Sequence, residues 1–207
     1  MIVDIAKYPF EDEEYLRTLL IGSLLLIGSV LILPAFILVG YFARTVQRAS
    51  NGESPPQFED YIGLFIDGVK LTAVMLGYFV LFFIALFVVA FLGAIDERAG
   101  TVGFILLVPT YFGLLYIATA AVYHFCQELD MRAAFDFRSI VQTSLSLRYL
   151  LVVVLVWVIL PTVFTVLQIL IGLTIIGILL LPATLVYEFI IYAKLMSLIP
   201  DRSTTTT

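Results

Sequence analysis

Long apolar stretches alternate with short polar segments along the whole chain. Four of the stretches are long enough to cross a bilayer, whose hydrocarbon core needs about 20 apolar residues in a helix. They lie at residues 71–93, 101–126, 149–171 and 178–199, and shorter apolar stretches lie at 18–27 and 30–48. The pattern predicts an all-α fold, a polytopic transmembrane helical bundle with five to six membrane helices.

Two of the polar connections have an amphipathic pattern. In residues 58–70, Tyr61, Phe65 and Val69 fall on one face of a helix, and acidic residues with Lys70 fall largely on the other. Residues 135–147 repeat this arrangement. Helices with one apolar and one charged face lie in the membrane interface, so we expect an interfacial helix in each connection.

Prolines recur in the apolar stretches at a nearly constant interval. Pro34, Pro109 and Pro182 are 75 and 73 residues apart, and Tyr41 and Tyr116 each follow a proline by seven residues. A fixed period of this kind indicates an internal repeat. We therefore predict a single domain, residues 1–207, built from three proline-containing helical hairpins. They span about 11–48, 71–126 and 149–199, and a polar tail follows at 200–207.

Basic residues predict the orientation, because cytoplasmic loops carry an excess of Lys and Arg. If both termini and the two long connections are cytoplasmic, ten of the eleven basic residues lie inside and only Arg98 lies outside. A five-helix alternative moves Lys7 and Arg17 outside, which leaves eight against three. Six helices are favoured. The alternative that the short first helix enters the bilayer without crossing it stays open.

Composition excludes several classes of protein. Apolar residues make up 62% of the chain and charged residues 13%, whereas soluble domains have about 45–50% and 25%. The net charge of −5 argues against nucleic acid as a partner, since nucleic-acid binding needs a basic patch. Cys126 is the single cysteine, so neither a disulfide framework nor a metal-binding cysteine pair is expected. No catalytic triad, phosphate-binding loop or zinc spacing occurs, so we expect no enzymatic activity and no cofactor.

Several short motifs are similar to those of one archaeal family. They are Tyr8-Pro-Phe-Glu-Asp, Leu19-Leu-Ile-Gly22, Gly40-Tyr41 followed by Arg44 and Arg48, and above all Leu64-Phe-Ile-Asp67-Gly68-Val-Lys70. The chain resembles the family catalogued as domain of unknown function 4013, which is common in halophilic archaea. The resemblance implies an integral membrane protein of archaeal origin, with no established activity and no catalytic residues. The acidic net charge also suits a salt-loving organism.

Glu188 is the most informative polar residue, because it lies about midway along the last apolar stretch. An acidic side chain there costs about 3 kcal/mol on insertion scales and should be paired or protonated inside the bundle. Glu188 with Tyr192, Gln168 and Tyr116 forms a candidate intramembrane polar site. It would handle protons, cations or a polar substrate. The competing and favoured interpretation is a structural hydrogen bond between helices.

Three basic residues near the predicted interface, Arg44, Arg48 and Lys70, are candidate contacts for anionic lipid headgroups. The alternative is that they only set the topology. Asp67 and Lys70, three residues apart, can pair along a helix. His124, the single histidine, has no partner at ligand spacing and is expected to anchor the interface, not to bind a metal.

These observations favour a non-enzymatic structural or accessory component of the cell membrane. Its expected partners are the lipid bilayer and either itself or another membrane protein, packed through small residues such as Ala118, Ala120 and Ala121. The alternative is a small transporter or lipid-handling protein that uses a midplane site around Glu188, as repeat-built transporters do.

Overall fold

The computed structural model describes residues 2–12 and 14–199, and all regular structure in that part of the chain is helical. The N-terminal half contains α1 (Ile2–Lys7), η1 (Tyr8–Phe10), α2 (Tyr15–Ile27), η2 (Gly28–Val30), α3 (Ile32–Ser50) and α4 (Tyr61–Ile95). The C-terminal half contains α5 (Glu97–Glu128), η3 (Ala133–Phe135), α6 (Phe137–Ser144), α7 (Leu147–Val154), the π-helical turn η4 (Leu155–Ile159), α8 (Leu160–Gly172) and α9 (Ile175–Met196). The predicted polar tail, 200–207, lies outside the described residues.

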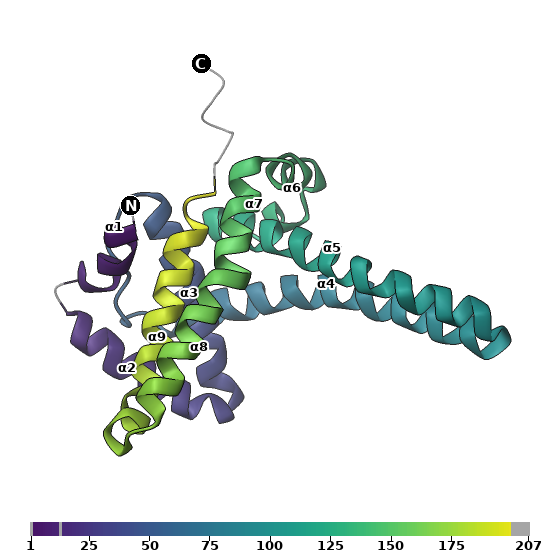
Figure 1. Ribbon diagram of the computed structural model, residues 1–207. Coiled ribbons are helices and arrows are strands. Elements are labelled where there is room, and N and C mark those ends of the chain that lie inside the picture. Colours follow the sequence, from purple (N-terminus) through teal and green to yellow (C-terminus); the bar gives the residue numbers. More distant parts are fainter. Residues whose placement is uncertain (1, 13, 200–207) are drawn as a thin grey trace.

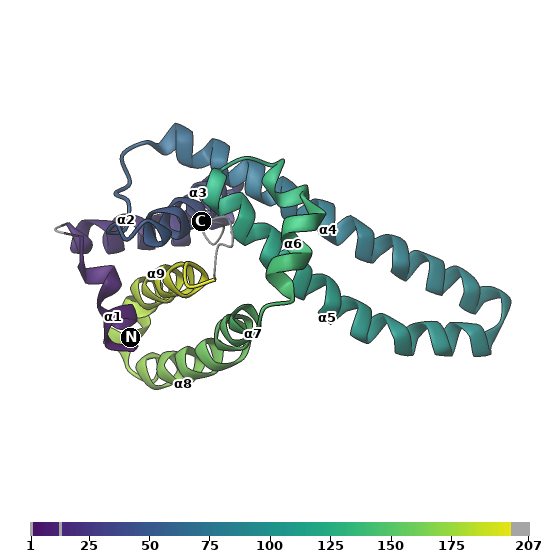
Figure 2. The same cartoon turned by 90° about the horizontal axis from the view of Figure 1, so that it is seen from above.

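The molecule consists of a bundle and a protruding hairpin. Helices α2, α3, α8 and α9 pack together, whereas α4 and α5 run side by side away from them (Figures 1 and 2). We call the outer part of this hairpin, residues 83–108, the arm. Its apolar side chains are largely exposed, so an apolar medium is needed to cover them.

Side-chain caps mark where most of the long helices begin. The carboxylate of Asp60 accepts a hydrogen bond from the Gly63 amide at the start of α4, and Asp96 caps α5 in the same way. Ser146 caps α7 and Thr174 caps α9. Each oxygen satisfies an amide that the first turn of a helix leaves without a partner, so the polar residues between apolar stretches set the helix boundaries.

Helix α4 differs from the expected division into an interfacial helix at 58–70 and a membrane helix from 71. It runs unbroken for 35 residues, about 52 Å at 1.5 Å per residue. No proline occurs within α4, so its backbone continues where the amphipathic pattern gives way to the apolar one. Only the expected surroundings of the helix change at that point. In the second connection a separate helix, α6, does form, within the expected 135–147.

Four helices of the described chain are long and apolar enough to cross a membrane. They cover Tyr61–Ile95, Glu97–Glu128, Leu147–Gly172 and Ile175–Met196. Residues Tyr15–Val30 form a shorter apolar segment. The all-helical, membrane-type architecture is therefore confirmed, and the layout of three membrane-crossing hairpins stays a prediction.

The prolines occupy different places in their helices. Pro34 lies in the first turn of α3, where its missing amide costs no helical hydrogen bond, whereas Pro109 and Pro182 lie inside α5 and α9. Pro161 is the second residue of α8, two residues after the end of the π-helical turn η4. The Thr162 hydroxyl donates to the Val158 carbonyl at 2.6 Å, as expected where a proline disturbs the backbone hydrogen bonds of a membrane helix.

Candidate functional site

Two glycines bring the backbones of α3 and α4 into direct contact. A Cβ atom on Gly40 would lie 2.7 Å from the carbonyl carbon of Leu64, and one on Gly68 would lie 2.7 Å from that of Phe36. Both distances are far inside van der Waals contact. Small residues permit such close approaches between membrane helices, so these two glycines determine where α3 and α4 cross.

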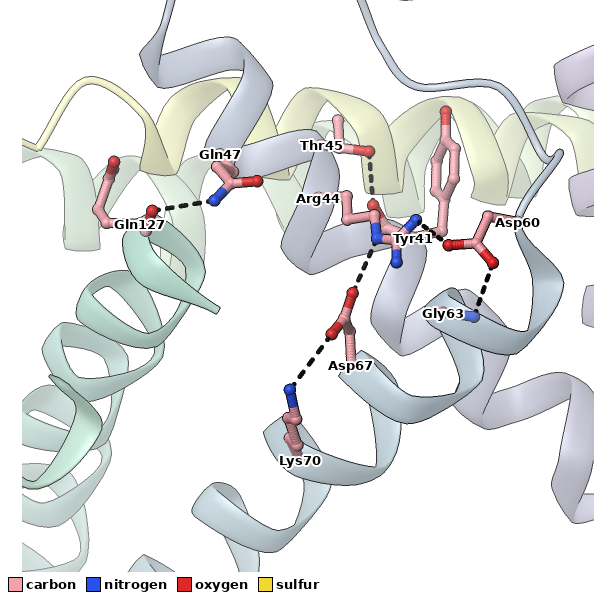
Figure 3. Close-up of polar contacts among 9 residues, drawn as sticks. All are labelled: Tyr41, Arg44, Thr45, Gln47, Asp60, Gly63, Asp67, Lys70 and Gln127. Carbon is pink, nitrogen blue, oxygen red and sulfur yellow. Dashed lines mark hydrogen bonds and ion pairs between the residues drawn. The ribbon is translucent and has the colours of Figure 1, made fainter. Parts of the chain in front are cut away.

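The crossing assembles a group of charges that we call the Arg44 cluster: Arg44, Asp60, Asp67 and Lys70 (Figure 3). Arg44 Nε lies 2.8 Å from Asp67 Oδ2, and its Nη1 lies 3.1 Å from Asp60 Oδ2. Lys70 Nζ lies 3.8 Å from Asp67 Oδ1. The expected pairing of Asp67 with Lys70 is therefore present but long, and Arg44 on the neighbouring helix is the closer partner.

The Arg44 cluster contains two carboxylates and two cations, so its formal charges cancel. The pKa of Asp60 is lowered, first by the hydrogen bond from the Gly63 amide and then by Arg44. Asp67 is buried, and the loss of one partner from a buried ion pair is destabilising because it leaves the other charge unpaired. The cluster therefore ties the start of α4 to α3 electrostatically.

The three candidate headgroup contacts each have an acidic partner within the chain. Arg44 and Lys70 pair inside the Arg44 cluster, and Arg48 Nε lies 3.1 Å from Glu53 Oε2. The side chain of Lys70 is 40% exposed and its contact is the longest of the three. A lipid phosphate would therefore have to displace an acidic partner at each of the three residues. The pair that is easiest to displace is that of Lys70.

The candidate intramembrane site is assembled in part. Gln168 Nε2 on α8 donates to Glu188 Oε2 on α9 at 2.7 Å, and Tyr192, one turn along α9, also interacts with the Glu188 carboxyl group. Tyr116 is engaged elsewhere, because its hydroxyl donates to the Ser144 carbonyl at 2.6 Å. The structure thus brings together Gln168, Glu188 and Tyr192 and directs Tyr116 toward α6.

A half-open cavity of about 450 Å³ lies between the hairpin α4–α5 and the bundle. Its lining is almost entirely apolar and comes from five elements. The walls include Val39 and Phe42 of α3, Met75, Tyr78 and Phe79 of α4, Tyr111, Leu115 and Ala118 of α5, Trp157 of η4, and Phe189 and Tyr192 of α9.

Trp157 is the residue of this region that sequence reasoning missed. Its indole Nε1 donates to Thr119 Oγ1 of α5 at 3.1 Å, which joins the π-helical turn to the hairpin. The signal was present in Pro161, because a proline removes one helical hydrogen bond and a π-helical turn is one response. Such turns often lie at functional sites.

His124 and the small residues of α5 have internal roles. His124 Nε2 lies 2.9 Å from Thr143 Oγ1 on α6. In the described part of the chain, no three His, Cys, Asp or Glu side chains are arranged to hold a metal ion. Ala120 and Ala121 are fully buried. These two residues face the protein's own core, so they pack within the chain. Association with a second copy or with another membrane protein stays a prediction.

The apolar helices and internally paired polar groups place the chain among membrane-type helical proteins. The family model described as Protein of unknown function (DUF4013) matches residues 21–181, well over half of the chain. The protein belongs to this family. No curated protein and no solved structure matches it. The matched region contains the glycine crossing, the hairpin α4–α5 and all four residues of the Arg44 cluster.

Proposed function

We propose that this protein is a non-enzymatic structural or accessory component of the cell membrane. One observation supports this proposal: the polar side chains with the best potential for chemistry are bonded within the chain. Glu188 bonds Gln168, Tyr116 bonds the Ser144 carbonyl, His124 contacts Thr143, and Arg44 pairs with two aspartates.

These bonds connect different helices, which is the role expected of polar groups in lipid. Hydrogen bonds between membrane helices contribute about 0.6 kcal/mol on average and up to about 1.7 kcal/mol. The Tyr149 hydroxyl also donates to the Tyr116 carbonyl and Trp157 to Thr119, so α5 is joined to the segment α7–η4 at two points. A bundle held together in this way can hold an exposed apolar surface in place for another membrane protein to contact.

The surface that we propose for association is the arm, and the partner is a second copy or another membrane protein. Phe87 is 72% exposed on the arm. We expect a Phe87→Cys chain, in a Cys126→Ser background, to form disulfide-linked dimers in native membranes. Leu173→Cys is the matched control, since Leu173 is as exposed but lies at the turn between α8 and α9.

Dimers from Phe87→Cys alone would support association of two copies through the arm. Conjugates of another mass from Phe87→Cys alone would indicate a different membrane partner. Equal cross-linking at both positions, or none at either, would contradict the proposal that the arm is the associating surface.

We also infer that both termini face the cytoplasm and that the source is a salt-loving archaeon. The first inference is supported by contacts of the N-terminal segment with the C-terminal half of α9: the Tyr187 hydroxyl donates to the Ala6 carbonyl at 2.8 Å, and Lys194 lies over the Tyr8 ring. Protease protection of a tag at each end tests it, and tags on opposite sides of the membrane would contradict it.

A second candidate function is a small transporter that uses Glu188. The bond from Gln168 to Glu188 favours it, because it holds a carboxyl group between two apolar helices. Proton or cation flux into proteoliposomes tests it, with Glu188→Gln as the variant and exposed Glu128→Gln as the control. The accessory role predicts no flux for any chain. Wild-type flux that only Glu188→Gln abolishes would favour transport.

A further inference from the structure

The lining of the cavity between the hairpin and the bundle is apolar, because polar side-chain groups of its residues form hydrogen bonds within the protein. The Tyr78 hydroxyl donates to the Ala134 carbonyl at 2.8 Å, outside the cavity lining. Thr119 Oγ1 donates to the Leu115 carbonyl and accepts from Trp157 Nε1. The Thr119 hydroxyl and the Trp157 indole N–H therefore both have a hydrogen-bond partner within the protein. The surface that faces the cavity is therefore hydrocarbon, although several lining residues carry polar groups.

This wall determines what can occupy the cavity. Water needs two to four polar partners to enter a buried space, and apolar cavities do not supply them. A polar or charged ligand would lose its hydration without replacement bonds. The expected occupant is therefore an apolar molecule. The cavity has a volume of about 450 Å³, and ligand pockets usually have roughly 300–1,000 Å³, so the occupant must be small enough to fit this space.

The cavity is too small to enclose a whole helix of another membrane protein. A helix about 30 Å long and about 10 Å across occupies about 2,400 Å³, roughly five times the cavity. A flexible chain of methylene groups fits, and it is the medium that surrounds apolar membrane helices. The cavity is half open, and its rim residues Met75, Phe79 and Tyr111 are exposed, so such a chain can enter from the side.

The geometry points to a binding site for one hydrocarbon chain of a lipid, held between α4–α5 and the bundle at Trp157. Leu71, Tyr78 and Met196 are buried residues of the lining, and Phe42 and Phe189 offer aromatic rings for the chain to lie against. The same chemistry is offered by the tail of a membrane phospholipid and by a free fatty acid. The site does not depend on the accessory role, and failure of either proposal leaves the other standing.

Trp157 provides the test, because it is the single tryptophan of the chain and lines the cavity. Bromine atoms on an acyl chain quench indole fluorescence only at short range. The full chain in a bromine-free detergent is titrated with a phospholipid that carries brominated acyl chains. We expect quenching that saturates at one bound lipid molecule per protein, and reversal by the same lipid without bromine.

Two cavity-filling variants make the test specific. Ala118→Phe on α5 and Val39→Phe on α3 each place a larger side chain in the lining of the cavity, and both should lose the saturable quenching. Ala90→Phe adds the same side chain on the exposed arm and should retain it. Size-exclusion profiles identify a variant that does not fold, and the other filling variant then decides.

A second titration with a brominated free fatty acid distinguishes the two sources of the chain. Saturable quenching by either probe supports the site and names its source. Quenching by both probes that rises in proportion to the brominated fraction, without saturation, would overturn the site, as would saturation that persists in a folded cavity-filling variant.

Discussion

Replacing Gly68 by alanine tests the backbone contact on which the Arg44 cluster depends. The added methyl group would lie 2.7 Å from the carbonyl carbon of Phe36 and nearer still to its oxygen. Ordinary contact begins at about 3.4 Å, so α3 and α4 must separate by at least about 0.7 Å. Backbone atoms cannot rotate away as side chains do. We therefore expect a cost at the upper end of the 1–3 kcal/mol typical of overpacking.

Helix propensity opposes this cost, because alanine favours a helix over glycine by about 1 kcal/mol. The net loss should be about 2 kcal/mol in the free energy of unfolding, measured by reversible denaturation in mixed detergent and SDS micelles. Gly113→Ala is the matched control: it also lies in a long helix, and its Cβ would have nothing within 4 Å. It should be neutral or slightly stabilising.

Equal stability of the Gly68→Ala and Gly113→Ala chains would refute the reasoning, since the two differ only in the neighbour that the methyl group meets. The double variant Gly40→Ala/Gly68→Ala gives a second reading. Both methyl groups separate the same two helices, so the combined loss should be smaller than the sum of the single losses. Additive losses would show that the two glycines act independently.

The remaining predictions concern the polar groups. Asp67→Asn should lower the free energy of unfolding by about 2 kcal/mol in the same denaturation assay, because Arg44 loses its nearest carboxylate. Arg44 is partly exposed, and solvent therefore reduces the full penalty. A loss as small as that of Asp60→Asn would contradict this expectation. The lowered pKa of Asp60 means that its contribution to stability is present above its unfolded pKa and is lost as the pH falls below about 3.8. Asp60→Asn keeps a helix cap and should flatten the acid-side fall in a thermal-stability profile, which an unchanged profile would disprove. Gln168→Leu should cost about 0.6–1.7 kcal/mol through loss of the bond to Glu188, and no loss in the Gln168→Leu chain would show that this bond contributes nothing.

The helices themselves could be predicted from the sequence because apolar length and polar caps are local properties. The turn at Gly28 and the polar loop from Asn51 both appear where the pattern changes. The continuity of α4 could not be predicted in this way. The sequence pattern places a boundary at Lys70, where the surroundings of the helix change, although the backbone has no reason to break there.

The candidate site was predictable only where its partners are close in sequence or share a helix. Glu188 and Tyr192 lie one turn apart, and the need of an intramembrane carboxyl group for a partner pointed to a neighbouring helix, where Gln168 is found. Arg44 and Asp67 are 23 residues apart. Their contact depends on where α3 and α4 cross, and that crossing is set by the two glycines, whose effect is visible only in three dimensions.

The contacts between the two ends of the chain carry a consequence for biogenesis. The Tyr187 hydroxyl bonds the Ala6 carbonyl across 181 residues, and the Lys194 ammonium group lies 4.3 Å from the centre of the Tyr8 ring. During synthesis the first residues leave the ribosome long before α9 exists, so they must wait at the membrane surface without their final neighbours. Assembly can close only after the last helix has been released, and a nascent chain that stops before Tyr187 should keep its leading segment open to proteases.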